Sequence, residues 1–177
     1  KPLAVMFPMR GADGLDEVRK FVQLSADEAQ CLLSPSRPIL LLEKQSPCRL
    51  AANVAPDLNE MGVFLPYSPL HELLLSDFGG PLVATSGNIS GTPICTTNED
   101  ALIQLGPLAD LFLLHNREIV TRVDDSVIKV VAGLPLVLRR ARGFVPSPIE
   151  ISKVLPKVLG CGAGLKNTFS LGREASI

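Results

Sequence analysis

The sequence has few residues that could hold a metal ion or cross-link the chain. Its 177 residues include four cysteines and two histidines. The cysteines form no C-x-x-C pair, and no histidine stands near them at the spacing of a metal site. We therefore expect neither a metal centre nor a disulfide framework. Four mostly buried thiols are typical of a reducing compartment, which predicts a cytoplasmic protein. The cysteines are Cys31, Cys48, Cys95 and Cys161.

Long apolar runs and an excess of charge of one sign are also missing. No apolar stretch approaches the roughly 20 residues that span a membrane, and the opening apolar run is too short for a signal peptide. Seventeen basic residues nearly balance eighteen acidic ones, which gives a net charge of −1 and no overall attraction to nucleic acid or an anionic membrane. Because the chain starts without methionine, inside a strand-like segment, we expect it to be part of a longer protein.

The common nucleotide-binding and catalytic motifs are absent as well. There is no Walker A lysine loop, and the spaced glycines of residues 160–164 are followed by residues typical of strands, not of a dinucleotide-binding helix. His71 and His115 are the only histidines, and neither has a matched acid and nucleophile, so no catalytic triad is expected. Any nucleotide site in this chain must therefore be built in another way.

The sequence does contain an alternation of short apolar runs and amphipathic segments. This alternation predicts an α/β fold, and the short strands late in the chain favour a twisted mixed sheet over a purely parallel one. Helices are expected at 16–21, 25–33, 70–75 and 96–105, the second opened by a capping box of Ser25 and Glu28. Strands are expected at 3–7, 39–42, 59–65, 82–84, 111–114, 126–131 and 136–139.

The end of the chain differs from the rest. Residues 144–148, Phe-Val-Pro-Ser-Pro, indicate a strand exit or linker. Residues 158–172 then have the pattern of a strand, a glycine turn and a second strand, which is too little to bury a core of its own. We therefore expect a main domain over residues 1–150, followed over residues 151–177 by a linker and the first hairpin of a second domain.

The most informative polar stretch is residues 85–91, Thr-Ser-Gly-Asn-Ile-Ser-Gly, which follows an expected strand. A strand that ends in small hydroxyl residues and glycines can present side-chain donors together with backbone N–H groups. Proteins hold phosphate or carboxylate oxygens in this way. Composition alone favours an ordinary polar turn, because short clusters of Ser, Gly and Asn mostly mark loops.

Two further polar clusters lie at expected strand ends. Residues 139–142, Arg-Arg-Ala-Arg, form a compact cationic patch with planar donors suited to phosphate, or else a solvated basic edge. Asp124 and Asp125 could hold Mg²⁺ on a nucleotide, and Ser126 could donate to a phosphate. Asp-Asp-Ser is equally common as a turn.

Several of these segments resemble one protein family. The Ser-Gly-Asn of residues 86–88 fits the S-x-N motif of the YrdC-like fold, which threonylcarbamoyl-adenylate synthases share. Longer strings at 55–71, 85–91, 115–127 and 138–146 are similar to the HypF carbamoyltransferases of NiFe-hydrogenase maturation. Residues 160–171 are similar to the first hairpin of the kinase-like domain that follows in that family.

The resemblance implies a fold and an activity. It implies a YrdC-like fold with a concave anion-binding groove over residues 1–150 and the start of a kinase-like domain over 151–177. In this family, carbamate derived from carbamoyl phosphate is joined to AMP from ATP, and pyrophosphate is released. The carbamoyl group then passes to the C-terminal cysteine of HypE and becomes a cyanide ligand of the hydrogenase iron. ATP with Mg²⁺ would be a substrate, and zinc belongs to a family region upstream of these residues.

The resemblance also assigns roles where the residues match. Ser86 and Asn88 would bind the adenylate phosphate or the carbamoyl group, and Ser126 would contact phosphate. Arg140, the third expected catalytic residue, or Arg142 would bind the triphosphate or the carboxyl oxygens. The predicted substrate-binding set, which contains no metal ligand, is Lys1, Thr85, Ser86, Asn88, Ser126, Arg140 and Arg142.

Two other functions are left open at this point. YrdC-like domains present a concave, positively lined face for which RNA binding has been proposed, although the net charge of −1 and the 5% aromatic content weaken that interpretation here. The chain alone could also be a scaffold whose groove stays empty.

Overall fold

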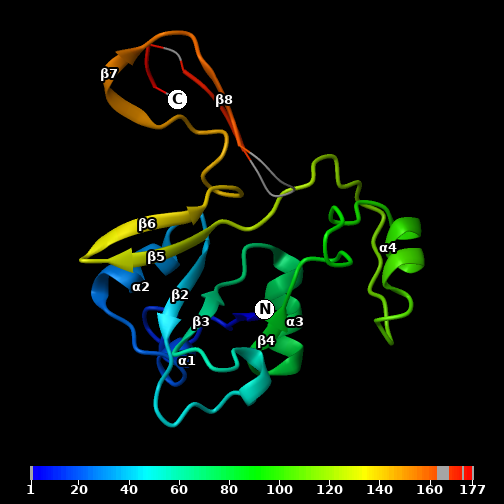
Figure 1. Ribbon diagram of the computed structural model, residues 1–177. Coiled ribbons are helices and arrows are strands. Elements are labelled where there is room, and N and C mark those ends of the chain that lie inside the picture. The colour runs from blue at the N-terminus through cyan, green and yellow to red at the C-terminus, as the bar shows by residue number, and fades with distance from the viewer. Residues whose placement is uncertain (1, 163–167, 173, 177) are drawn as a thin grey trace. The chain divides into compact units, whose positions relative to one another are not determined.

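The computed structural model describes residues 2–162, 168–172 and 174–176. The chain packs as two units, each of which is described by itself (Figure 1). Unit 1 comprises Lys1–Thr85 and Asp125–Phe144, and unit 2 comprises Ser86–Asp124 and Val145–Ile177. The expected boundary near residue 150 stays a prediction.

A mixed six-stranded sheet forms the centre of unit 1. Its strands are β1 Ala4–Met6, β2 Ile39–Glu43, β3 Glu60–Phe64, β4 Leu82–Ala84, β5 Val127–Val131 and β6 Leu134–Arg139. They lie in the order β4-β1-β3-β2-β5-β6. β1 pairs with β3 and β2 pairs with β5 in parallel, whereas the other neighbours are antiparallel. The expected α/β fold with a mixed sheet is therefore confirmed.

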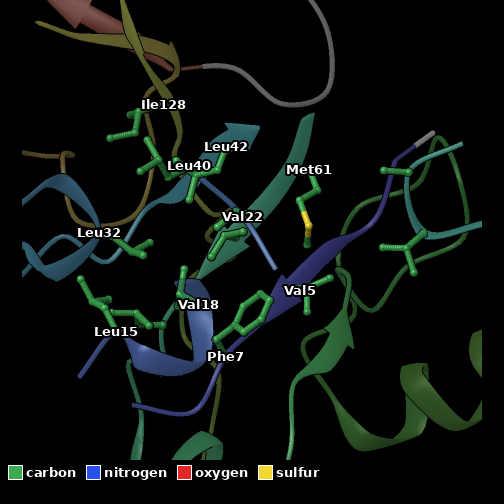
Figure 2. Close-up of a cluster of buried hydrophobic side chains, with 14 residues drawn as sticks. Val5, Phe7, Leu15, Val18, Val22, Leu32, Leu40, Leu42, Met61 and Ile128 are labelled. Atoms are coloured by element: carbon green, nitrogen blue, oxygen red, sulfur yellow. The ribbon is translucent and has the colours of Figure 1, made fainter. Parts of the chain in front are cut away.

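Helices cover both faces of this sheet. They are α1 Asp16–Arg19, α2 Ala26–Leu33 and α3 Pro69–Phe78. Successive side chains of a strand point to opposite faces, so Val5 of β1 joins the cluster under α1 and α2, whereas Met6 packs with Leu75 of α3. Figure 2 shows the larger cluster, in which Phe7, Leu32 and Leu40 are fully buried.

The starts of the helices follow the expected capping chemistry. The Ser25 hydroxyl accepts a hydrogen bond from the Glu28 N–H at 3.3 Å, and the Glu28 carboxylate accepts one from the Ser25 N–H at 2.8 Å. This confirms the predicted capping box of α2. Ser68 caps α3 in a similar way, through the N–H of His71 at 3.3 Å. A cap of this kind fixes where the first turn of α3 begins.

Unit 2 contains, among the described residues, one helix and two pairs of short strands. They are α4 Asn98–Leu105, β7 Glu150–Leu155 paired with β10 Glu174–Ser176, and β8 Leu159–Cys161 paired with β9 Phe169–Leu171. The two strands of the hairpin expected at 158–172 are thus confirmed. Part of its expected glycine turn, residues 163–167, lies outside the described residues.

Two expectations about this chain are wrong. Residues 111–114 form no strand, because this leucine-rich run pairs with no described segment and stays in solvent; Leu111 is 91% exposed. The thiols are free but not mostly buried: Cys31, Cys48 and Cys95 are partly exposed and Cys161 is exposed. A search of the described residues finds no helix that is both long and apolar enough to cross a membrane.

Candidate functional site

The loop after β4 is held in shape by the side chain of Asn88. Its Oδ1 accepts a hydrogen bond from the Ser86 hydroxyl at 2.5 Å, and its Nδ2 donates to the carbonyls of Ile89 and Thr92, each at 2.9 Å. The Thr92 hydroxyl donates to the same Ile89 carbonyl at 2.8 Å. Residues 86–92 therefore form an internally bonded loop, in which Asn88 contacts Ser86, Ile89 and Thr92.

This arrangement bears on the predicted phosphate contacts of the loop. The hydroxyl hydrogen of Ser86 is used by Asn88, so Ser86 must give up that bond in order to donate to a phosphate. Ser86 and Asn88 are partly exposed and Thr85 is exposed, which leaves all three within reach of solvent. Their roles in substrate binding stay predictions.

Arg142, which follows β6, is held by contacts on every side of its guanidinium group. Nε and Nη2 contact the same Asp125 carboxylate oxygen at 2.9 and 2.8 Å. Nη1 donates to the carbonyl of Ser36 at 3.3 Å, and Nη2 donates to the carbonyl of Arg37 at 2.8 Å. The group lies 3.5 Å from the centre of the Tyr67 ring, a cation–π stack. All three nitrogens of Arg142 are therefore engaged within unit 1.

Ser126, at the start of β5, joins the same region from inside. It has no exposed surface. Its hydroxyl donates to the Arg142 carbonyl at 2.9 Å and accepts from the N–H of Ala141 at 2.7 Å. Ser126 thus ties the start of β5 to the residues that follow β6. A contact with phosphate would require both exposure and a new hydrogen-bond arrangement, so that role also stays a prediction.

The sequence interpretation missed Tyr67 and left His71 without a partner. The two rings meet edge to face with their centres 4.5 Å apart, and Tyr67 in turn lies under Arg142. The Nδ1 atom of His71 is buried and has no hydrogen-bond partner among the described residues. The available signal was the only tyrosine of the chain, placed directly between a buried strand and a capped helix.

Burial shifts the pKa values of both rings toward their neutral forms. Burial raises the pKa of the Tyr67 phenol, and the nearby Asp125 carboxylate acts in the same direction. Burial lowers the pKa of His71 below 6.5, with Arg142 acting the same way and Asp125 and Glu72 acting against it. The shift therefore favours the neutral form of His71. Because its Nδ1 has no partner, a neutral ring with a bare acceptor at Nδ1 is the form that burial tolerates best.

The remaining predicted residues differ in how much the structure shows of them. Lys1 lies outside the described residues, and Arg140 and Asp124 are partly buried and take part in interactions. Asp125 has its carboxylate paired with Arg142, and no group of three or more His, Cys, Asp or Glu gathers as a metal site among the described residues. A nucleotide-bound Mg²⁺ needs only one or two carboxylates beside the phosphates. Since the predicted groove segments are divided between the two units, the groove stays a prediction.

Replacing Ser126 with alanine should lower the free energy of unfolding by about 2 kcal/mol. The substitution leaves the partly buried N–H of Ala141 without its acceptor and the Arg142 carbonyl without its donor, and the loss of a buried partner costs about 1–3 kcal/mol. Urea unfolding followed by circular dichroism measures the change. The matched control is Ser76→Ala, at an exposed position of α3. Equal stabilities of the two variants would contradict this account.

His71 should make stability depend on pH near neutrality. Its pKa in the folded chain is lower than in the unfolded chain, so the unfolded state binds more protons as the pH falls through 6.5. The stability that neutral His71 contributes is thus present above pH 6.5 and lost below it. Urea unfolding from pH 7.5 to pH 5 should show a smaller decline for His71→Gln than for wild type. His115→Gln removes a histidine from unit 2 as the control, and parallel profiles for wild type and His71→Gln would refute the prediction.

Comparison with known proteins identifies the family of this chain. The Sua5/YciO/YrdC family model, described as telomere recombination, matches residues 1–141. The chain belongs to this family. Among curated Sua5/YciO/YrdC relatives, the threonylcarbamoyl-AMP synthase of Yersinia pestis is 41% identical over 49 residues, which are 28% of this chain and 26% of that protein.

Other relatives match almost all of the chain. The carbamoyltransferase HypF of Synechocystis is 45% identical over 98% of the chain and 22% of that protein. A probable carbamoyltransferase HypF of Methanocaldococcus jannaschii is 40% identical over 95% of the chain and 21% of that protein. The predicted resemblance to YrdC-like proteins and to HypF is thereby confirmed. The chain spans about a fifth of the length of these HypF relatives.

Solved structures agree with these relatives. A full-length HypF in a phosphate- and nucleotide-bound form has a TM-score of 0.86 and 46% identity over 99% of this chain and 27% of that one. HypF of T. kodakarensis has a TM-score of 0.88 and 41% identity over 99% of this chain and 22% of that one. Sua5 of P. abyssi has a TM-score of 0.63 at 21% identity, over 80% of this chain and 40% of that one, and shares the fold.

Proposed function

We propose that this chain is the adenylate-forming part of a HypF-type carbamoyltransferase. The observation that carries the proposal is a similarity of 46% identity, over 99% of the chain, to a HypF structure in a phosphate- and nucleotide-bound form. The same similarity favours a carbamoyltransferase over an RNA-binding module, as does a net charge of −1. The substrates and partners below come from that likeness and are part of the proposal.

The proposed reaction has two steps before transfer. Carbamoyl phosphate is hydrolysed to carbamate and inorganic phosphate. A carbamate oxygen then attacks the α-phosphorus of ATP, the bond to the bridging oxygen breaks, and pyrophosphate leaves as carbamoyl adenylate forms. Two anions must be held together for this attack, so positioning and charge neutralisation carry the catalysis without a protein nucleophile. ATP enters as its Mg²⁺ complex, which supplies part of that neutralisation.

We assign different roles to Arg140 and Arg142. Arg142 already donates to one carboxylate and two carbonyls, so we assign it to holding the end of β6 in place. Arg140 also takes part in interactions, and we assign the contact with the triphosphate to it because it matches the motif of the family. Ser86 and Asn88 bind the adenylate phosphate or the carbamoyl group, and Ser126 supports the segment that carries both arginines.

The later step and the cell compartment complete the proposal. The carbamoyl group is then transferred to the C-terminal cysteine of HypE. The cysteine sulfur attacks the carbamoyl carbon of the adenylate, and AMP leaves. Four free thiols, one of them exposed, are consistent with a reducing cytoplasm.

Exchange of labelled pyrophosphate into ATP tests the proposed reaction. In the full-length protein, exchange should require both carbamoyl phosphate and Mg²⁺, and Ser86→Ala should reduce it strongly. Ser90→Ala is the matched control, because Ser90 is an exposed hydroxyl in the same loop. Exchange that proceeds equally without carbamoyl phosphate would overturn the proposed function. Normal, carbamoyl-phosphate-dependent exchange in Ser86→Ala would overturn only the role of Ser86.

A further inference from the structure

The connection between β2 and β3 is longer than its geometry requires. These strands are antiparallel neighbours, and such a pair can be joined by about two residues. Here residues 44–59 make the connection, with only the short 3-10 helix Ala52–Val54 inside it (Figure 1). Connections longer than about 12 residues with little regular structure are usually functional when they are ordered.

This connection borders a half-open cavity of about 250 Å³ in unit 1. Its wall is mainly apolar, and its floor is shared with the hydrophobic core through Val54, Ala55 and Met61. Three alanines in the wall leave space that larger side chains would fill. The lining residues are Lys44, Cys48, Leu50, Ala51, Ala52, Val54, Ala55, Asp57 and Met61.

Lys44 places a positive charge in this apolar wall. Its backbone N–H donates to the carbonyl of Asn59 at 2.8 Å, which anchors it beside the sheet. Its ammonium group donates to the carbonyl of Ala55 at 3.1 Å and forms no ion pair with any residue that the structure describes. An ammonium group has three donors, so Lys44 retains hydrogen-bonding capacity toward a ligand.

We propose that this cavity binds a small organic monoanion, with a carboxylate on Lys44 and a short apolar body against Leu50, Val54 and Met61. Its volume equals that of about eight water molecules at roughly 30 Å³ each, which suits a compact ligand. Asp57 lines the same cavity and is exposed. Its carboxylate repels any anion, so the single positive charge of Lys44 suits one negative charge on the ligand and not the two of a phosphate monoester. The site does not rest on the proposed adenylate chemistry, which uses other residues.

Cys48 lies in the cavity wall and can report on occupancy. We would treat the protein with iodoacetamide in the presence of sodium benzoate and quantify alkylation of Cys48 by peptide mass spectrometry. Cys161, exposed in unit 2, serves as the internal reference. At about ten times its dissociation constant, benzoate should slow alkylation of Cys48 about tenfold and leave Cys161 unchanged. Benzamide, which is neutral and of nearly the same shape, should protect far less.

Two variants test the assigned contacts. Lys44→Met should abolish protection by benzoate, whereas Lys44→Arg should keep it, and circular dichroism confirms that both variants fold. Ala52→Leu should fill the cavity and remove protection by excluding the ligand, while Lys44 stays in place. The proposal is overturned by equal protection from benzamide and benzoate, by no protection from either, or by full protection in Lys44→Met.

Discussion

Replacing Arg142 with methionine should lower the free energy of unfolding by about 3 kcal/mol. The change leaves the Asp125 carboxylate, which is 27% exposed, without its partner, and it removes donors from the carbonyls of Ser36 and Arg37. Removing one partner of a buried ion pair costs about 3–5 kcal/mol, and partial exposure places this pair at the low end. Urea unfolding followed by circular dichroism measures the loss.

Two controls separate this network from a general effect of losing an arginine. Arg142→Lys keeps the charge but has no planar fork to bridge the carboxylate and carbonyls, so it should recover less than half of the loss. Arg122→Met removes the hydrogen bond from Nε to the Ile94 carbonyl, at 2.9 Å in unit 2, and should cost less than about 1 kcal/mol. If Arg142→Met were as stable as Arg122→Met, the network would not support the fold.

Replacing Asn88 with alanine should reduce carbamoyl-phosphate-dependent pyrophosphate exchange by about 100-fold in the full-length protein. The substitution removes the three hydrogen bonds that fix the loop after β4. A displacement of reacting groups by about 1 Å is enough for a loss of this size. The measurement is the exchange rate at saturating ATP and carbamoyl phosphate.

The loop offers its own control for that experiment. Thr92→Val removes one hydrogen bond, to the carbonyl of Ile89, and leaves the three bonds of Asn88 in place. It should lower exchange less than tenfold, because one neutral hydrogen bond contributes about 1 kcal/mol. Exchange by Asn88→Ala within twofold of wild type would show that the loop does not position the reacting groups.

The fold was predictable from sequence wherever local chemistry and burial agreed. The Ser25 and Glu28 pattern set the start of α2, and the continuous apolar run of residues 39–42 marked the strand β2, covered on both faces. The leucines of residues 111–114 show the opposite case. An apolar run becomes a strand only when a neighbour pairs with it, and no described segment does so here. The sequence does not predict the strand β7, because its pairing with β10 is a non-local contact that local patterns do not reveal.

The sequence predicted several residues of the site but not the hydrogen bonds and ring contacts between them. The sequence indicated Ser126 and Arg142 as polar groups at strand ends, but not that each bonds to the segment carrying the other. The contact between Arg142 and residues 36–37 joins positions far apart in the chain. Tyr67 lies in the segment Pro-Tyr-Ser-Pro of residues 66–69, which is typical of a turn. Only the folded chain places its ring against Arg142.

The position of Tyr67 also gives the chain a built-in optical probe. The sequence contains no tryptophan and no other tyrosine, so emission excited in the tyrosine band arises from this one ring. That ring lies between the guanidinium of Arg142 and the imidazole of His71. Its quantum yield and lifetime therefore follow the state of its contacts with Arg142 and His71, without any label. Stopped-flow mixing with a nucleotide would then show, in real time, whether those contacts open or hold.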